Sequence, residues 1–290
     1  MITVIIGPTA SGKSALAVGR AGNENAVIIN ADAMQCYDAL PILTAQPTLV
    51  EQQNIPHALY SVLDATARLT AAGWVELAAK EIKNAYAKNQ KPYLVGGTGL
   101  YIKALMDGLS PIPDISEDIR AAVRTREKEE GLAAVYADLQ TRDPVMAGRL
   151  KPGDTQRILR AMEVLEATGE SLSAWQNIPP IKPHDGWDFH VIQMQPTKEV
   201  LEEKIRLRLA HMMKNGVMDE VAKLSERIDA GDVPHDAPII VAHGFRHLRD
   251  FLKSKRNLED ALEDIVIETR QYTKRQRTWL RHQIRADEVI

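Results

Sequence analysis

Short apolar runs alternate with longer segments of helical character along much of this 290-residue chain. The runs at 2–6 (ITVII), 26–30 (AVIIN) and 92–97 (PYLVGG) are short and mostly apolar, which is typical of strands buried in a parallel sheet. The segment at 13–21 (KSALAVGRA) is rich in helix formers and follows the first run after a short loop. This order predicts an α/β fold, in which helices flank a parallel sheet.

A stretch near the middle of the chain departs from this alternation. Proline-rich segments at 110–116 (SPIPDIS) and 177–186 (NIPPIKPHDG) bound it. Helical patterns fill it, and the last of them lies between a candidate N-cap, Asp154, and a candidate stop, Gly169. We therefore predict an all-helical insertion domain in an α/β catalytic core, with these boundaries: core 1–110 and 186–290, insertion 111–185.

The loop GPTASGKS at 7–14 matches the P-loop pattern, with a strand before it and a helix after it. Its backbone N–H groups are expected to converge on phosphate, Lys13 to add a positive charge, and Ser14 to ligate Mg²⁺. A glycine turn before a helix is the alternative. The predicted phosphate-binding residues are Gly7, Pro8, Thr9, Ala10, Ser11, Gly12, Lys13 and Ser14.

The P-loop predicts a P-loop NTPase-like core, yet two usual partners of a split nucleotide are missing. No strongly apolar strand ends in paired carboxylates, and no segment resembles the base-reading motifs of GTPases. The bound phosphate therefore need not belong to a nucleotide.

Two more predicted strands end in polar residues. Asp32 follows the run at 26–30, and Thr98 follows the run at 92–97. Because the carboxyl ends of parallel strands meet at one edge of a sheet, we expect both residues to lie near Lys13 in one pocket. The alternatives are an N-cap or turn role for Asp32 and a structural turn for Thr98.

Composition limits the classes of partner. The net charge is −3 and the pI about 6.3, so a nucleic-acid site has to be a local patch. The single cysteine, Cys36, excludes an internal disulfide and a cysteine-rich metal site. No apolar run reaches the roughly 18 residues of a membrane span, and the first apolar run leads directly into the P-loop. We expect a cytoplasmic protein without membrane contact.

Two helical segments supply local positive charge. In the segment that starts after a candidate N-cap, Thr197, the side chains of Lys204 and Arg208 share one face; solvated charges beside Glu203 are the alternative. The predicted apolar face of that helix comprises Val200, Leu201, Ile205, Leu209 and Met212. Near the C-terminus a cationic stripe comprises Arg270, Lys274, Arg277 and Arg281. We expect it to contact RNA phosphates; a solvent-exposed, solubilising face is the alternative.

Seven motifs occur in the order seen in tRNA dimethylallyltransferases: GPTASGKS, ADAMQCY, TAQP, IPH, VGGTGLYIKAL, DTQRILRAMEV and ETRQYTKRQRTW. The chain resembles that family from Gly7 to about Trp279. The resemblance implies a prenyltransferase that moves a dimethylallyl group from dimethylallyl diphosphate to tRNA and releases diphosphate. The acceptor would be N6 of adenosine 37, next to the anticodon of tRNAs that read codons beginning with U.

In this chemistry Asp32 is the expected base that takes the N6 proton, and Thr98 is expected to hydrogen-bond the bridging oxygen of the leaving group. The P-loop with Lys13, and Mg²⁺ held partly by Ser14, would stabilise the departing diphosphate. The resemblance places a further diphosphate contact at Arg208. It also places tRNA contacts at Asp32, Ala33, Met34, Gln35, Gln156, Arg157, Ile158, Leu159 and Arg160, and we add Thr98, Arg120, Arg270, Lys274 and Arg277. We expect a monomer that needs no protein partner and binds the tRNA anticodon stem-loop.

The match departs from the family in three places. Gln46 stands where a lysine is usual, and His57 lacks a second histidine beside it. The segment 241–248 replaces a more hydrophobic stretch, in which His243 is unexpected. A lone His57 is more typical of a loop hydrogen bond than of catalysis.

Other functions stay open at this point. An adenylate isopentenyltransferase would use the same donor pocket with free AMP, ADP or ATP, although the helical insertion and the basic stripe favour tRNA. A P-loop kinase of small metabolites and an inactive RNA-binding protein are further alternatives.

Overall fold

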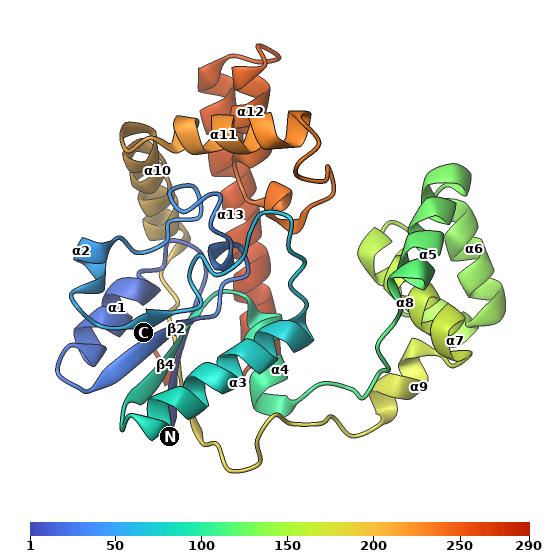
Figure 1. Cartoon of the computed structure of the whole chain (residues 1–290), viewed down its shortest axis with the longest axis horizontal. Helices are drawn as coiled ribbons and strands as arrows, with labels where there is room; N and C mark the ends of the chain where they lie inside the picture. The colour runs from blue at the N-terminus through green and yellow to red at the C-terminus, as the bar shows by residue number, and fades with distance from the viewer. The chain divides into compact units, whose positions relative to one another are not determined.

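Six parallel strands form the sheet of the larger of two compact units in the computed structural model, which describes residues 1–290 (Figure 1). The larger unit comprises Met1–Met106 and Pro183–Ile290, and the smaller comprises Asp107–Lys182. The predicted boundaries, at 110/111 and 185/186, lie within a few residues of these. The predicted α/β fold with a parallel sheet is confirmed.

The strand order is β3-β2-β4-β1-β5-β6, and every neighbouring pair is parallel. All carboxyl ends therefore lie at one edge of the sheet. The strands are β1 Ile2–Ile6, β2 Ala26–Asn30, β3 His57–Ala58, β4 Lys91–Gly96, β5 Phe189–Gln193 and β6 Glu288–Val289. The three predicted strands are confirmed as β1, β2 and β4, with β4 displaced by one residue.

Helices pack on the sheet because its central strands are apolar on both faces. Ile5, Ile28 and Val95 share a buried cluster with Ala17 and Val18 of α1. The helices of this unit are α1 Lys13–Ala21, α2 Leu49–Gln52, α3 Ala71–Ala87, α4 Gly99–Asp107, α10 Lys198–Lys214, α11 Val217–Asp229, α12 Phe245–Leu252 and α13 Leu258–Gln283, with 3₁₀ turns η1 Met34–Cys36 and η2 Pro238–Val241. None of the helices combines the length and apolar character that a bilayer crossing needs.

Helix α10 starts as predicted, because the Thr197 side chain accepts a hydrogen bond from the Val200 N–H. Four residues of its predicted apolar face are buried: Leu201, Ile205, Leu209 and Met212. The prediction was wrong for Val200, which is 38% exposed because it lies in the first turn, away from that face.

The smaller unit is all-helical and has its own core. Val135, Ile158 and Met162 are buried at its centre. Asp154 caps α8 by accepting from the Arg157 N–H, and Gly169 ends it at φ 71°, as predicted. Its helices are α5 Glu117–Glu130, α6 Leu132–Arg142, α7 Pro144–Ala147, α8 Thr155–Thr168 and α9 Leu172–Asn177.

Glycine at the end of β4 allows the chain after β2 to come unusually close. A Cβ atom built on Gly96 would lie 2.1 Å from the carbonyl oxygen of Ala31. One built on Gly99, at the start of α4, would lie 2.1 Å from the ring of Trp279 on α13. These two contacts bring the ends of β2 and β4 and the helix α13 together at one edge of the sheet.

We expect Gly96→Ala to destabilise the fold by about 3 kcal/mol, because its methyl group would overlap rigid backbone. Urea unfolding followed by circular dichroism measures this. Gly19→Ala is the matched control: the site has no atom within 4 Å of the new Cβ, and alanine in helix α1 should be neutral or stabilising by up to about 1 kcal/mol. An unchanged unfolding midpoint for Gly96→Ala would contradict this packing.

Candidate active site

The P-loop joins β1 to α1, with its glycine at the helix start in the left-handed region. Gly12, the N-cap residue of α1, has φ 94° and no side chain that could accept from the N–H groups at the start of the helix. These N–H groups therefore remain available to an anion. The Lys13 ammonium donates to the carbonyl oxygen of Pro8 at 2.8 Å, which folds the side chain back over the loop. The Ser14 side chain is exposed beside it. The loop thus leaves backbone N–H groups, an ammonium and a hydroxyl available at the start of α1, and phosphate binding there stays a prediction.

Lys13 and Arg208 are two cations whose charge is only partly balanced. Burial lowers the pKa of Lys13 to about 8, against the opposing field of Asp32, and the charge of Arg208 lowers it further. Burial also lowers the pKa of Arg208, again against the field of Asp32. The three groups therefore interact at one place, with two positive charges and one negative charge. A bound anion would relieve this imbalance.

Arg208 reaches the site from α10 and also holds the loop after β2. Its guanidinium donates to the carbonyl oxygen of Thr44 at 3.0 Å, and the side-chain amide of Gln35 donates to the same oxygen at 2.9 Å. Lys204, one turn earlier, has its ammonium 3.8 Å from a Cβ built on Gly12. The shared face predicted for Lys204 and Arg208 thus lies along the P-loop, and neither residue pairs with Glu203.

Thr98 and Asp32 come from the ends of β4 and β2, as predicted, and they are tied together by the backbone. The Thr98 hydroxyl accepts from the Ala33 N–H at 3.0 Å. One oxygen of Asp32 accepts from the Met34 N–H at 3.1 Å, which is the turn role given above as an alternative. The other oxygen makes no hydrogen bond to the protein. Asp32 is therefore held by one oxygen while the second can accept a proton.

Gln276 of α13 is a site residue that the sequence analysis missed. Its side chain is 6% exposed, and its carbonyl oxygen accepts from the Thr9 N–H at 2.9 Å. Its amide nitrogen donates to the Gly97 carbonyl oxygen at 3.1 Å. One buried amide thus joins the P-loop to the segment that carries Thr98. The motif RQRTW contains this residue between two arginines, and the sequence does not show that its side chain is buried.

His243 and Tyr272 form an aromatic pair beside this site. Their ring centroids are 4.2 Å apart, and His243 Nδ1 lies 3.3 Å from a carboxylate oxygen of Glu268. Burial raises the pKa of Tyr272 to about 12, and the charge of Asp32 adds to the effect. His243, which departs from the family pattern, is therefore packed against an aromatic residue that feels the charge of Asp32.

Gln46 and His57, the other two departures from the family pattern, hold loops through hydrogen bonds. Gln46 donates to the Tyr37 carbonyl oxygen at 2.8 Å and accepts from the Ser61 hydroxyl at 2.7 Å, so it holds its loop in place of a lysine. His57 Nδ1 lies 2.7 Å from the Ile55 carbonyl oxygen, and burial lowers its pKa. His57 has the loop hydrogen bond that was expected.

The predicted RNA-contacting segment at 156–160 lies on α8 of the smaller unit. Ile158 is completely buried in the core of that unit, so its side chain is not available to RNA, and this part of the prediction is wrong. The other four reach the surface to different extents: Gln156, Arg157, Leu159 and Arg160. Arg157 pairs with Asp154 at 3.0 Å, and Arg160 with Glu163 at 3.4 Å. Arg120 of α5 pairs with Asp114 at 3.4 Å.

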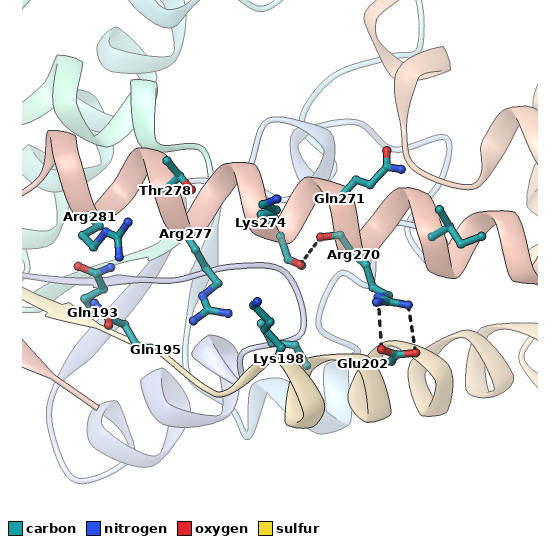
Figure 2. A pocket seen from close by; sticks show the side chains of 13 residues that line it. Gln193, Gln195, Lys198, Glu202, Arg270, Gln271, Lys274, Arg277, Thr278 and Arg281 are labelled. Carbon is teal, nitrogen blue, oxygen red and sulfur yellow. Dashed lines mark hydrogen bonds and ion pairs between the residues drawn. The ribbon is translucent and has the colours of Figure 1, made fainter.

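The cationic stripe lies on the side of α13 away from this site. Gln276 and Trp279 face the P-loop and Gly99, whereas Arg270, Lys274 and Arg277 line a separate cavity (Figure 2). The structure therefore does not bring these three predicted RNA-binding residues together with Asp32 and Thr98.

Comparisons with known families match most of the chain. The IPP transferase profile matches residues 35–283, and the isopentenyl transferase profile matches residues 1–60. The tRNA dimethylallyltransferases of Azorhizobium caulinodans and Paramagnetospirillum magneticum are 43% and 44% identical over 286 and 283 residues. The alignments cover 98% of this chain and 90% and 88% of those relatives.

Solved structures of tRNA isopentenyl- and dimethylallyltransferases also match the fold of this chain. The full-length tRNA isopentenylpyrophosphate transferase from Bacillus halodurans matches with a TM-score of 0.69 at 29% identity, covering 100% of this chain and 89% of that one. A eukaryotic dimethylallyltransferase acting on tRNA matches with a TM-score of 0.81 at 25% identity, covering 96% of this chain and 69% of that one.

We expect Gln276→Met to weaken the affinity for inorganic diphosphate about tenfold, because a thioether of similar size cannot bond the Thr9 N–H or the Gly97 carbonyl. Isothermal titration calorimetry measures this. Gln283→Met, at an exposed position on the same helix, is the control and should bind like the wild type. Wild-type affinity in Gln276→Met would show that the P-loop does not depend on this amide.

Proposed function

Because this chain belongs to the IPP transferase family, as its resemblance to tRNA dimethylallyltransferases predicted, we propose that it transfers a dimethylallyl group from dimethylallyl diphosphate to N6 of adenosine 37 in tRNA. The observation that carries the proposal is the meeting of a P-loop, Arg208, Asp32 and Thr98 at one sheet edge. Diphosphate is the second product.

The diphosphate half of the donor fits the P-loop. The bond between C1 of the allyl group and the bridging oxygen breaks with its electron pair leaving on diphosphate. Preorganised donors, namely the loop N–H groups, Lys13 and Arg208, stabilise the negative charge that develops there. The Thr98 hydroxyl oxygen accepts from the Ala33 N–H, so its own hydrogen is free for the bridging oxygen.

The acceptor half of the reaction needs a proton acceptor. As N6 of adenine attacks C1, its proton passes to the free carboxylate oxygen of Asp32, which the Met34 N–H holds in place through the other oxygen. The products are N6-dimethylallyladenosine, diphosphate and a proton on Asp32.

Mg²⁺ fits the residues present as a cofactor held mainly by the diphosphate. No group of three or more His, Cys, Asp or Glu side chains is arranged to hold a metal ion, while the exposed Ser14 hydroxyl beside Lys13 is free to serve as a ligand. When bound, the ion supplies further neutralisation of the leaving group.

The tRNA anticodon stem-loop is the proposed partner, bound by a monomer in the cytoplasm. To reach the half-buried Asp32 carboxylate the adenine has to leave its stack, and polar groups of the protein replace its neighbours. In the loop of Asp32, Ala33, Met34 and Gln35, the Gln35 amide nitrogen already holds Thr44 and Ala45, so its carbonyl oxygen is the part left for RNA. Gln156, Arg157 and Arg160 of the smaller unit are further candidate contacts.

The acceptor is tested by mixing the protein with Mg²⁺, dimethylallyl diphosphate labelled in the allyl group, and either unmodified tRNA or AMP. We expect label in tRNA and none in AMP. Label in AMP alone would indicate an adenylate isopentenyltransferase, and ATP consumption with a small alcohol acceptor would indicate a kinase.

We expect Asp32→Asn to lower the single-turnover transfer rate by about 10²- to 10⁴-fold, because the amide cannot take the proton. Its oxygen can still accept from the Met34 N–H, so affinity for tRNA and donor should stay within a few fold of the wild type. A near-normal rate in this variant would exclude Asp32 as the base.

A further inference from the structure

A second cavity lies between the end of β5, helix α10 and helix α13. Its volume is about 540 Å³, which is within the range of pockets for small ligands. Figure 2 shows Arg277 and Arg281 of α13 and Lys198 of α10 pointing into the space between the two helices. The cationic side chains that line the cavity are Lys198, Arg270, Lys274, Arg277 and Arg281.

The positive charge in this cavity is only partly balanced by the protein. Glu202 is the one carboxylate that lines it, and this residue is shared between Arg270 at 3.3 Å and Arg206 at 3.5 Å. No carboxylate lies within ion-pair distance of the other four cations, Lys198, Lys274, Arg277 and Arg281, although the charges of Lys198 and Arg277 act on Glu199 from farther away. Like charges that face one another across a concave surface repel, and a bound anion removes that repulsion.

Gln193 adds a neutral hydrogen-bonding group to the cationic cavity. It ends β5, is only 4% exposed and lines the cavity, yet its side-chain amide makes no hydrogen bond to the protein. Its amide borders the open space of the cavity, so its N–H and C=O groups are available to a molecule bound there. An anion among the cations would accept a hydrogen bond from this amide.

The cavity is separate from the P-loop site. None of the residues at 7–14 lines it, and Gln276 and Trp279 point to the other side of α13. Leu201 and Ile267 give it an apolar wall beside the charges. Arg270, Lys274 and Arg277 thus serve a different space from the one that contains Asp32.

We propose that this cavity binds a small anion that carries two or more phosphate groups. Several phosphate groups match several cations, since each lysine or arginine contacts phosphate oxygens by charge-assisted hydrogen bonds. The cations and the Gln193 amide line one concave space of about 540 Å³, which matches the size of a small anion with several phosphate groups. The apolar wall accommodates a base or a prenyl group attached to the phosphates.

Calorimetric titration with inorganic triphosphate tests the site. We expect two sites in the wild type, one at the P-loop and one in the cavity. Lys13→Ala should lose the P-loop site and keep the other. Adding Lys274→Met and Arg277→Met should weaken the remaining site about tenfold or more, and Gln193→Leu, which changes no charge, should weaken it several fold.

The control for net charge is the pair Lys80→Met and Lys83→Met on the exposed face of α3, which should leave both sites intact. If Lys13→Ala does not fold, the cavity substitutions in the wild-type background should reduce two sites to one. No saturable site in folded Lys13→Ala, or equal weakening by the α3 pair, overturns the proposal. The proposal is also overturned if the cavity variants bind tRNA more weakly but bind triphosphate as the wild type does. That result would assign the cations to RNA binding.

Competition against triphosphate in the Lys13→Ala protein identifies the source of the phosphates. Preference for ATP supports a nucleoside triphosphate, and preference for diphosphate or dimethylallyl diphosphate supports the product or the donor. Displacement by sulfate at equal ionic strength as effectively as by any of these would overturn the site. Failure of the proposed function can be told apart from failure of this cavity site. If the proposed function is wrong, Lys13→Ala should leave the binding of dimethylallyl diphosphate unchanged.

Discussion

Two cations, Lys13 and Arg208, share one carboxylate, Asp32, at the carboxyl edge of a parallel sheet, and the site is organised around this imbalance. Burial disfavours both positive charges, as the lowered pKa of each shows. An anion at the P-loop restores the balance. A diphosphate that leaves during the reaction suits such a site, because its negative charge grows as the bond to carbon breaks. Asp32 keeps one oxygen free to accept a proton.

Helix α13 completes the site although it lies more than two hundred residues from the P-loop in the chain. Gln276 joins the P-loop to the Thr98 segment, and Trp279 packs on Gly99, where no larger residue fits. The same helix lies between two regions rich in positive charge. One face supports the P-loop, and the opposite face carries the cations of the second cavity.

The parts of the site that sequence predicted are those encoded by local pattern. The P-loop, Asp32 and Thr98 each follow an apolar strand, and parallel pairing then brings them to one edge. Strands β3 and β6 have two residues each and too little pattern to be found. Gln276 acts through contacts with Thr9 and Gly97, and its sequence position contains no sign of these distant partners.

Which way a helix face points also depends on packing that the sequence does not specify. The four-three-four spacing of Arg270, Lys274, Arg277 and Arg281 correctly placed them on one face, but which cavity that face lines was set by the docking of α13. In the same way Ile158 is spaced for the core and is buried there, so the motif that contains it is not a continuous contact surface.

The most direct test of the central claim is ³¹P NMR of a reaction that contains the protein, Mg²⁺, dimethylallyl diphosphate and unmodified tRNA, with no nucleoside triphosphate. We expect intact diphosphate to accumulate in equal amount to the prenylated adenosine, and Lys13→Ala to slow both together. A requirement for ATP, or orthophosphate as the main product signal, would contradict it.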